Sequence, residues 1–179
     1  KNSRKEGNIT YLAQELAVLI LTAGGVYMDL KREKVSNCWI LFGAILGICW
    51  GICCFGIAGI LRFTVGFLFP LILMYPLFYI RALGAGDLKL LAIVGGFLGA
   101  REIFGCVIFS FCSGACLALI ILIVRRNLAE RLHYFFQYFR NLIQTGEMLP
   151  YGKPGIQPEN FHFTVAILLG VLFWLGGGW

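Results

Sequence analysis

Apolar residues dominate this chain in long runs, broken only by short polar segments. Crossing the hydrocarbon layer of a membrane takes about 20 mostly apolar residues. Six runs are candidates for such spans: Ile9–Met28, Cys38–Ile60, Thr64–Ile80, Leu88–Ala100, Ile103–Val124 and Phe161–Trp179. The pattern predicts an all-α, polytopic membrane protein with about six transmembrane helices. The length predicts one integral-membrane domain over residues 1–179.

The fourth run is shorter than a bilayer requires. Leu88–Ala100 spans only if its helix begins at Gly86 or Asp87 and tilts, or if the bilayer thins locally. With that start, Asp87 lies in the first helical turn, just inside one membrane face. The amino-terminal end of a helix dipole stabilises a carboxylate at such a position.

A different pattern fills the polar segment between the fifth and sixth runs. Its apolar residues recur every three to four positions: Leu128, Leu132, Phe135, Phe136, Phe139, Leu142 and Ile143. This spacing predicts an amphipathic helix that lies in the membrane interface on the cytoplasmic side. A lid or docking element beside a functional site is the alternative role.

Composition and charge agree with a membrane location. Of 179 residues, 59% are hydrophobic and 13% are charged, whereas about 25% are charged in soluble domains. Lys and Arg are richer at the run ends that carry Asp29 and Asp87, so that face is predicted to be cytoplasmic, in the cell membrane. The net charge of +6 fits basic loops that meet lipid headgroups. Without a basic stripe on a soluble face, we expect no nucleic-acid partner.

The seven cysteines do not predict a metal site. The sequence contains no Cys-x-x-Cys pair, and the surroundings of Cys112 and Cys116 are apolar with no further ligand nearby. We interpret the cysteines as small packing residues, and we expect neither a metal nor another cofactor.

Asp29 and Asp87 are the candidate functional residues, because an ionisable group at a membrane-embedded position is costly and suggests function. Two carboxyls that share one proton activate water in aspartic proteases. A small proton- or ion-coupled transporter that relays protons through the same two residues is the alternative. Relay acids are expected toward the midplane beside broken helices, whereas these two lie at one edge.

Each aspartate stands in a distinctive segment. Asp87 follows Gly84 and Gly86, and glycines permit unusual backbone conformations and close approach of another chain. A nucleotide-binding Gly-x-Gly-x-x-Gly loop is excluded because Lys89 occupies the last glycine position. Asp29 is followed by a basic stretch that runs to Asn37.

These segments resemble the motifs of the GxGD intramembrane aspartyl proteases, specifically the type IV prepilin peptidases. That family's first motif is an aspartate, a basic stretch and Ile-Pro-Asn; residues 29–37 keep the spacing, with Val35 and Ser36 in place of Ile-Pro. Its second motif, Gly-x-Gly-Asp-x-Lys, matches fully at residues 84–89. Residues 149–152 and 165–170 resemble its final loop and helix.

The resemblance implies that Asp29 and Asp87 are catalytic and that Gly84, Gly86 and Lys89 form the supporting loop. It assigns Lys34 and Asn37 to the first motif. Lys89 would tune the charge of Asp87 or, as we favour, meet a lipid phosphate. Apart from the resemblance, His162 at the mouth of the last run could reach the active site, but we favour a role as an anchor at the membrane boundary.

The resemblance also implies a reaction and a partner. Family members remove the basic leader of a prepilin or pseudopilin precursor at the cytoplasmic membrane face. Many carry an additional methyltransferase segment with two Cys-x-x-Cys pairs, which this sequence lacks. It therefore resembles the short, peptidase-only form associated with Tad/Flp-type or competence-type pili. The particular substrate and the oligomeric state are not predicted.

Overall fold

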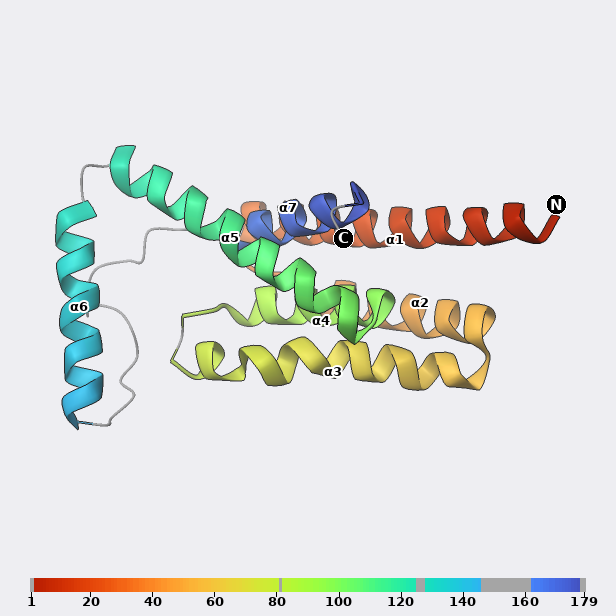
Figure 1. The fold of residues 1–179 in the computed structure, drawn as a ribbon, viewed down its shortest axis with the longest axis horizontal. Coiled ribbons are helices and arrows are strands. Elements are labelled where there is room, and N and C mark those ends of the chain that lie inside the picture. The colour runs from red at the N-terminus through yellow and green to blue at the C-terminus, as the bar shows by residue number, and fades with distance from the viewer. Residues whose placement is uncertain (1, 81, 125–127, 146–161, 178–179) are drawn as a thin grey trace.

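The computed structural model describes residues 2–80, 82–124, 128–145 and 162–177, and all regular structure in these ranges is helical. The elements are α1 (Asn2–Arg32), α2 (Asn37–Phe55), α3 (Ile57–Tyr79), α4 (Ala85–Leu98), α5 (Ala100–Val124), α6 (Leu128–Thr145) and α7 (Phe163–Leu175). Four of them, α1, α2, α3 and α5, are long and apolar enough to cross a membrane, and α7 is a shorter apolar helix. The predicted all-α membrane class is confirmed (Figure 1).

The predicted boundary between the second and third runs is wrong. We expected Cys38–Ile60 and Thr64–Ile80, but the chain turns at Gly56, whose φ of 62° favours glycine. Arg62 therefore lies inside α3 rather than in a loop. Its guanidinium donates to the carbonyl oxygen of Leu98 over 3.3 Å and lies 4.5 Å from the ring centre of Phe55. These contacts allow a charged residue to continue the helix.

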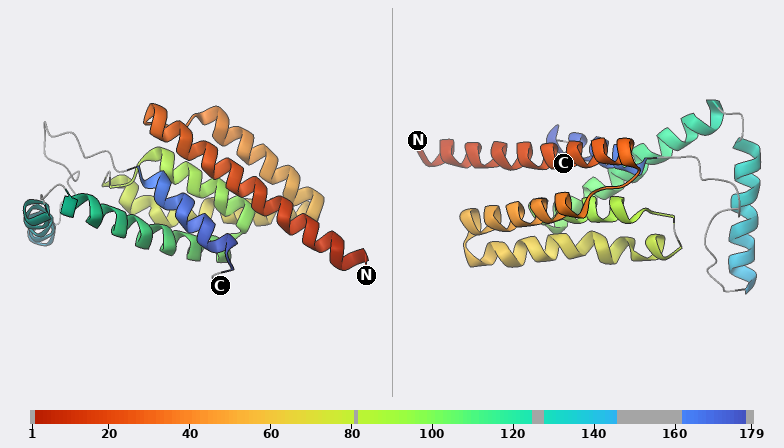
Figure 2. Two further views of the ribbon diagram at one scale, coloured as in Figure 1. Left: turned by 90° about the horizontal axis from the view of Figure 1, so that it is seen from above. Right: turned by 180° about the vertical axis from the view of Figure 1, so that it is seen from behind.

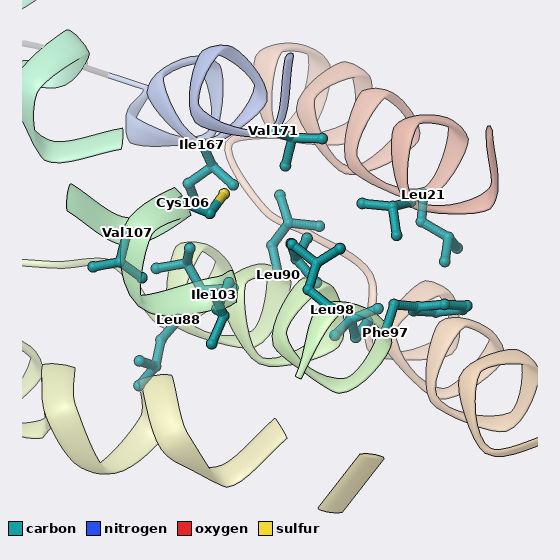
Figure 3. Close-up of a cluster of buried hydrophobic side chains, with 14 of the residues drawn as sticks. Leu21, Leu88, Leu90, Phe97, Leu98, Ile103, Cys106, Val107, Ile167 and Val171 are labelled. Atoms are coloured by element: carbon teal, nitrogen blue, oxygen red, sulfur yellow. The ribbon is translucent and has the colours of Figure 1, made fainter. Parts of the chain in front are cut away.

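Helix α4 is the central helix of the bundle. It packs against α1, α2, α3, α5 and α7, and every residue from Leu90 to Leu98 is buried. Figure 3 shows its leucines meeting side chains of α1, α5 and α7. Fourteen residues rise about 21 Å, less than the roughly 30 Å of a hydrocarbon core. The helix begins at Ala85, close to the start that we predicted, and protein surrounds it.

Close glycine contacts fix α4 against α3. A Cβ built on Gly66 would collide with the carbonyl oxygen of Gly95, and the ring of Phe63 covers Gly96. Small residues let two helix backbones approach closely in a membrane protein. The neighbours of α4 therefore hold it at a defined depth, and with it the residues of its first turn.

Three helix ends lie together at one end of the bundle. The carboxyl end of α1 and the amino ends of α4 and α7 lie at this end (Figures 1 and 2). Helix α6 lies crosswise beyond the same end, and its packing contacts within the described bundle are with α5. The fold thus brings the two segments singled out in the sequence to one place.

Candidate active site

Asp29 lies in the last turn of α1 and faces α7. The helix ends just beyond it, where the amide of Glu33 donates to the Asp29 carbonyl oxygen and Glu33 adopts a φ of 53°. A carboxylate is poorly placed at the carboxyl end of a helix dipole. Its Oδ2 atom instead accepts a hydrogen bond from the Thr164 hydroxyl at 2.8 Å and lies 2.9 Å from Nδ1 of His162.

Asp87 lies in the first turn of α4, as predicted, three residues after the N-cap Gly84. A side chain at this position can reach back to the amide of the N-cap residue. The backbone amides of Gly84 and Thr164 both hydrogen-bond the Asp87 carboxyl. One of these amides comes from its own helix start and the other from α7.

Thr164 therefore contacts both aspartates. Its hydroxyl bonds Asp29 and its backbone bonds Asp87, so the two carboxyls lie at one site although they are far apart in the sequence. The opposite arrangement, with carboxyls on different ends of the bundle or turned outward toward lipid, does not occur.

Burial sets the proton affinity of Asp87, which precedes the apolar segment of α4. Loss of solvent, followed by the negative charge of Asp29, raises the pKa of Asp87 from 3.8 to about 7. The amides of Gly84 and Thr164 and the charge of His162 act in the opposite direction. At neutral pH, Asp87 is thus divided between its protonated and ionised forms.

The two motif glycines provide space rather than unusual backbone angles. Neither has a positive φ, so the expectation that they need special conformations is wrong. A Cβ on Gly84 would lie 2.9 Å from the Oδ2 atom of Asp87. A Cβ on Gly86 would lie 3.2 Å from the Cγ2 atom of Val35. Glycine thus makes room for the carboxyl at one position and for the first motif at the other.

The first and second motifs are also joined directly. Nζ of Lys89 donates to Oδ1 of Asn37 over 2.8 Å, and the pairing of Lys89 with a lipid phosphate stays a prediction. Val35 is 3% exposed and packs on Gly86. Lys34 is exposed, and the described contacts do not bring it to either aspartate.

Two further residues belong to the site. Thr164 was not predicted, and His162 contacts Asp29, which is the alternative role considered for it rather than the favoured one. The signal was present as a His-x-Thr pair at the start of an otherwise apolar run. Residues 149–152, which resemble the family's final loop, lie outside the described residues.

An open hollow of about 470 Å³ adjoins the site on the α3 side. Its lining combines the carboxyl end of α3 with the start of α4: Tyr75, Phe78, Tyr79, Leu83, Gly84 and Ala85. It provides an aromatic surface next to the loop that supports Asp87. Within the described residues, no group of three or more His, Cys, Asp or Glu side chains is placed to hold a metal.

The sequence is similar to a known protein family. A family model described as the type IV leader peptidase family matches residues 16–119. The range includes both aspartates and ends before His162 and Thr164. No curated protein and no solved structure matches the chain significantly.

Proposed function

The chain belongs to the type IV leader peptidase family, whose model covers more than half of it, and from this premise we propose that Asp29 and Asp87 are the catalytic pair of a prepilin peptidase. Family membership makes the protein a peptidase. The observation that carries the aspartyl mechanism is the contact of Thr164 with both carboxyls. Two acids held by one residue are arranged to share a proton and a water molecule.

In the proposed reaction, Asp87 holds the proton and Asp29 is ionised. Asp29 accepts a proton from a water molecule between the carboxyls, and the resulting hydroxide attacks the carbonyl carbon of the scissile peptide bond. The Asp87 hydroxyl hydrogen-bonds the carbonyl oxygen as negative charge develops there. The proton taken up by Asp29 then passes to the leaving amine as the carbon–nitrogen bond breaks, which releases the leader and the shortened precursor.

We also propose a membrane arrangement for the site. Six of the helices cross or enter the bilayer, with α4 held inside the bundle, and α6 lies in the interface at the end that carries the aspartates. Exposed apolar side chains on α6 support this position: Phe135, Phe136, Phe139 and Ile143. The distribution of Lys and Arg makes this the cytoplasmic face, in the cell membrane.

The proposed substrate is a pilin-like precursor of the Tad/Flp or competence type, with a short basic leader before an apolar helix. We infer that the apolar helix lies against the bundle while the leader extends past the aspartates. The hollow beside Gly84 offers the leader a binding surface. Tyr75 and Tyr79 are exposed there, and a tyrosine ring attracts the Lys and Arg cations of such a leader.

The test is leader removal by purified protein in detergent, with a pilin-like precursor as substrate and mass spectrometry of the product. We expect one cut before the apolar helix for the wild type, and none for Asp87→Asn. Glu15→Gln is the matched control, because it neutralises another acid of α1, the helix that carries Asp29, and should cleave normally. Normal cleavage by Asp87→Asn would end the assignment.

A further inference from the structure

Thr164 differs from the other buried hydroxyl residues of the described chain. Thr22, Ser110 and Thr164 are all fully buried. Thr22 and Ser110 donate to carbonyl oxygens four residues earlier in their own helices, which is the usual way to satisfy such a group. Thr164 donates to the carboxylate of Asp29 on another helix. A buried donor directed at a charged group of a different element indicates a function beyond satisfying its own helix.

The backbone of Thr164 is also directed at the site. Thr164 is the second residue of α7, where the amide has no acceptor within its own helix. The amide of the following residue, Val165, already donates to the His162 carbonyl oxygen. The Thr164 amide hydrogen-bonds the Asp87 carboxyl instead. One residue thus presents a side-chain donor to one aspartate and a main-chain donor to the other.

Helix α5 fixes the start of α7 independently of the aspartates. The ring of Phe163 lies 5.0 Å from that of Phe111, centre to centre, and a Cβ on Gly114 would approach it to 3.0 Å. Farther along, Ser113 Oγ donates to the Ala166 carbonyl oxygen over 3.3 Å. Because α5 packs against this side of α7, the position of Thr164 does not depend on the two carboxyls.

From this geometry we propose that Thr164 is the positioning residue of the aspartate pair and sets the separation of the two carboxyls, with His162 as a second contact on Asp29. The inference rests on the proposed function. Both contacts are made to the Oδ2 atom of Asp29. Within the described residues no hydrogen bond reaches the Oδ1 atom, which leaves Oδ1 to accept the proton of the water in the proposed reaction.

Two substitutions at Thr164 separate the effect of its hydroxyl group from the effect of its packing. Thr164→Val keeps the shape and the amide but removes the hydroxyl, and Thr164→Ser keeps the hydroxyl. We expect Thr164→Val to lower kcat by roughly 10- to 100-fold with KM nearly unchanged, because a hydrogen bond to a charged group is lost. The kcat of Thr164→Ser should stay within about threefold of the wild-type value, because this variant loses only the contact of one methyl group.

Thr22→Val is the matched control, since it makes the same change at an equally buried threonine whose hydroxyl serves only its own helix. It should leave kcat unchanged. Thermal unfolding of all three variants in detergent shows whether each is folded at the assay temperature. A loss of kcat confined to Thr164→Val cannot then be attributed to the removal of any buried hydroxyl.

The serine variant distinguishes positioning from packing, because it keeps the hydroxyl donor to Asp29 and loses only the methyl group. Wild-type kcat in Thr164→Val, a loss that falls on KM rather than on kcat, or equal losses in the valine and serine variants would each overturn the inference. Absence of cleavage by the wild-type protein would instead contradict the proposed function.

Discussion

The Nζ atom of Lys89 donates a hydrogen bond over 2.8 Å to the Oδ1 atom of Asn37, 52 residues away in the chain. The contact joins α4 near Asp87 to the first residue of α2. It therefore links the first sequence motif directly to the second. Lys89 thus connects the helix start that carries Asp87 to the last residue of the first motif.

This contact predicts a coupled effect of Asn37→Ala and Lys89→Ala. Each should destabilise the protein by about 1 kcal/mol, because either change removes the same hydrogen bond. The double variant should lose less than the sum of the two, since it has no further contact to lose. Thermal unfolding in detergent measures the effect, with the exposed Lys34→Ala as the control. Strictly additive losses would show that the two residues act separately.

A methyl group at Gly84 should impair the reaction more than the fold. In Gly84→Ala, the added Cβ would lie 2.9 Å from Oδ2 of Asp87, so the carboxyl must move. A displacement of this kind can lower kcat on the order of 100-fold. The unfolding temperature should change little, because the glycine has an ordinary φ and is exposed. Wild-type kcat in the alanine variant would mean that the position of this carboxyl is unimportant.

The contact between Gly86 and Val35 predicts a compensating pair. Gly86→Ala places a Cβ 3.2 Å from the Val35 Cγ2 atom, and crowding of this kind costs about 1 kcal/mol. Val35→Ala destabilises the wild type by leaving a cavity, but it also removes the atom that crowds the new methyl group, so the double variant should lose less than the sum of the two single losses. Unfolding temperatures of the two single variants and the double variant measure this. Losses that add in the double variant would argue against the contact.

Much of the fold follows directly from the apolar runs, since only helices can satisfy their own backbone within a single membrane segment. The ends of the runs are less predictable. Gly56 ends α2 within an uninterrupted apolar stretch, and Arg62 continues α3 because the Leu98 carbonyl and the Phe55 ring receive its charge. Such contacts between helices leave no mark in the local pattern.

The residues of the site were also predictable only in part. Asp29 and Asp87 are conspicuous because acids are rare at the ends of apolar runs, and their shared membrane face follows from the alternating direction of the helices. The contacts of Asp29 with His162 and Thr164 join residues 133 and 135 positions apart. They depend on how α7 packs between α1 and α5, which neither periodicity nor charge specifies.

The raised pKa of Asp87 predicts a dependence of stability on pH. Its folded-state pKa of about 7 lies above the ordinary 3.8, so between these values the folded protein binds more protons than the unfolded chain. The contribution of Asp87 to stability is therefore lost as pH rises through this window. Asp87→Asn removes that loss. We therefore expect the unfolding temperature of the variant to rise relative to that of the wild type as pH increases from 4 to about 8.

The comparison is made as the difference between variant and wild type at each pH, because Asp29 and His162, the charged neighbours of Asp87, are present in both proteins. Glu15→Gln serves as the control and should follow the wild type over the same range. If the unfolding temperatures of Asp87→Asn and the wild type differ by the same amount at acidic and alkaline pH, the pKa of Asp87 is not raised by folding.

Leader removal by Asp29→Asn, Asp87→Asn and the double variant tests the central claim most directly, because it asks whether the two carboxyls act as one catalytic unit. Residues that act together show strongly non-additive losses. We predict that each single variant lowers the cleavage rate by at least about 1,000-fold and that the double variant is no slower than either. Wild-type cleavage by either single variant, or losses that multiply in the double variant, would contradict it.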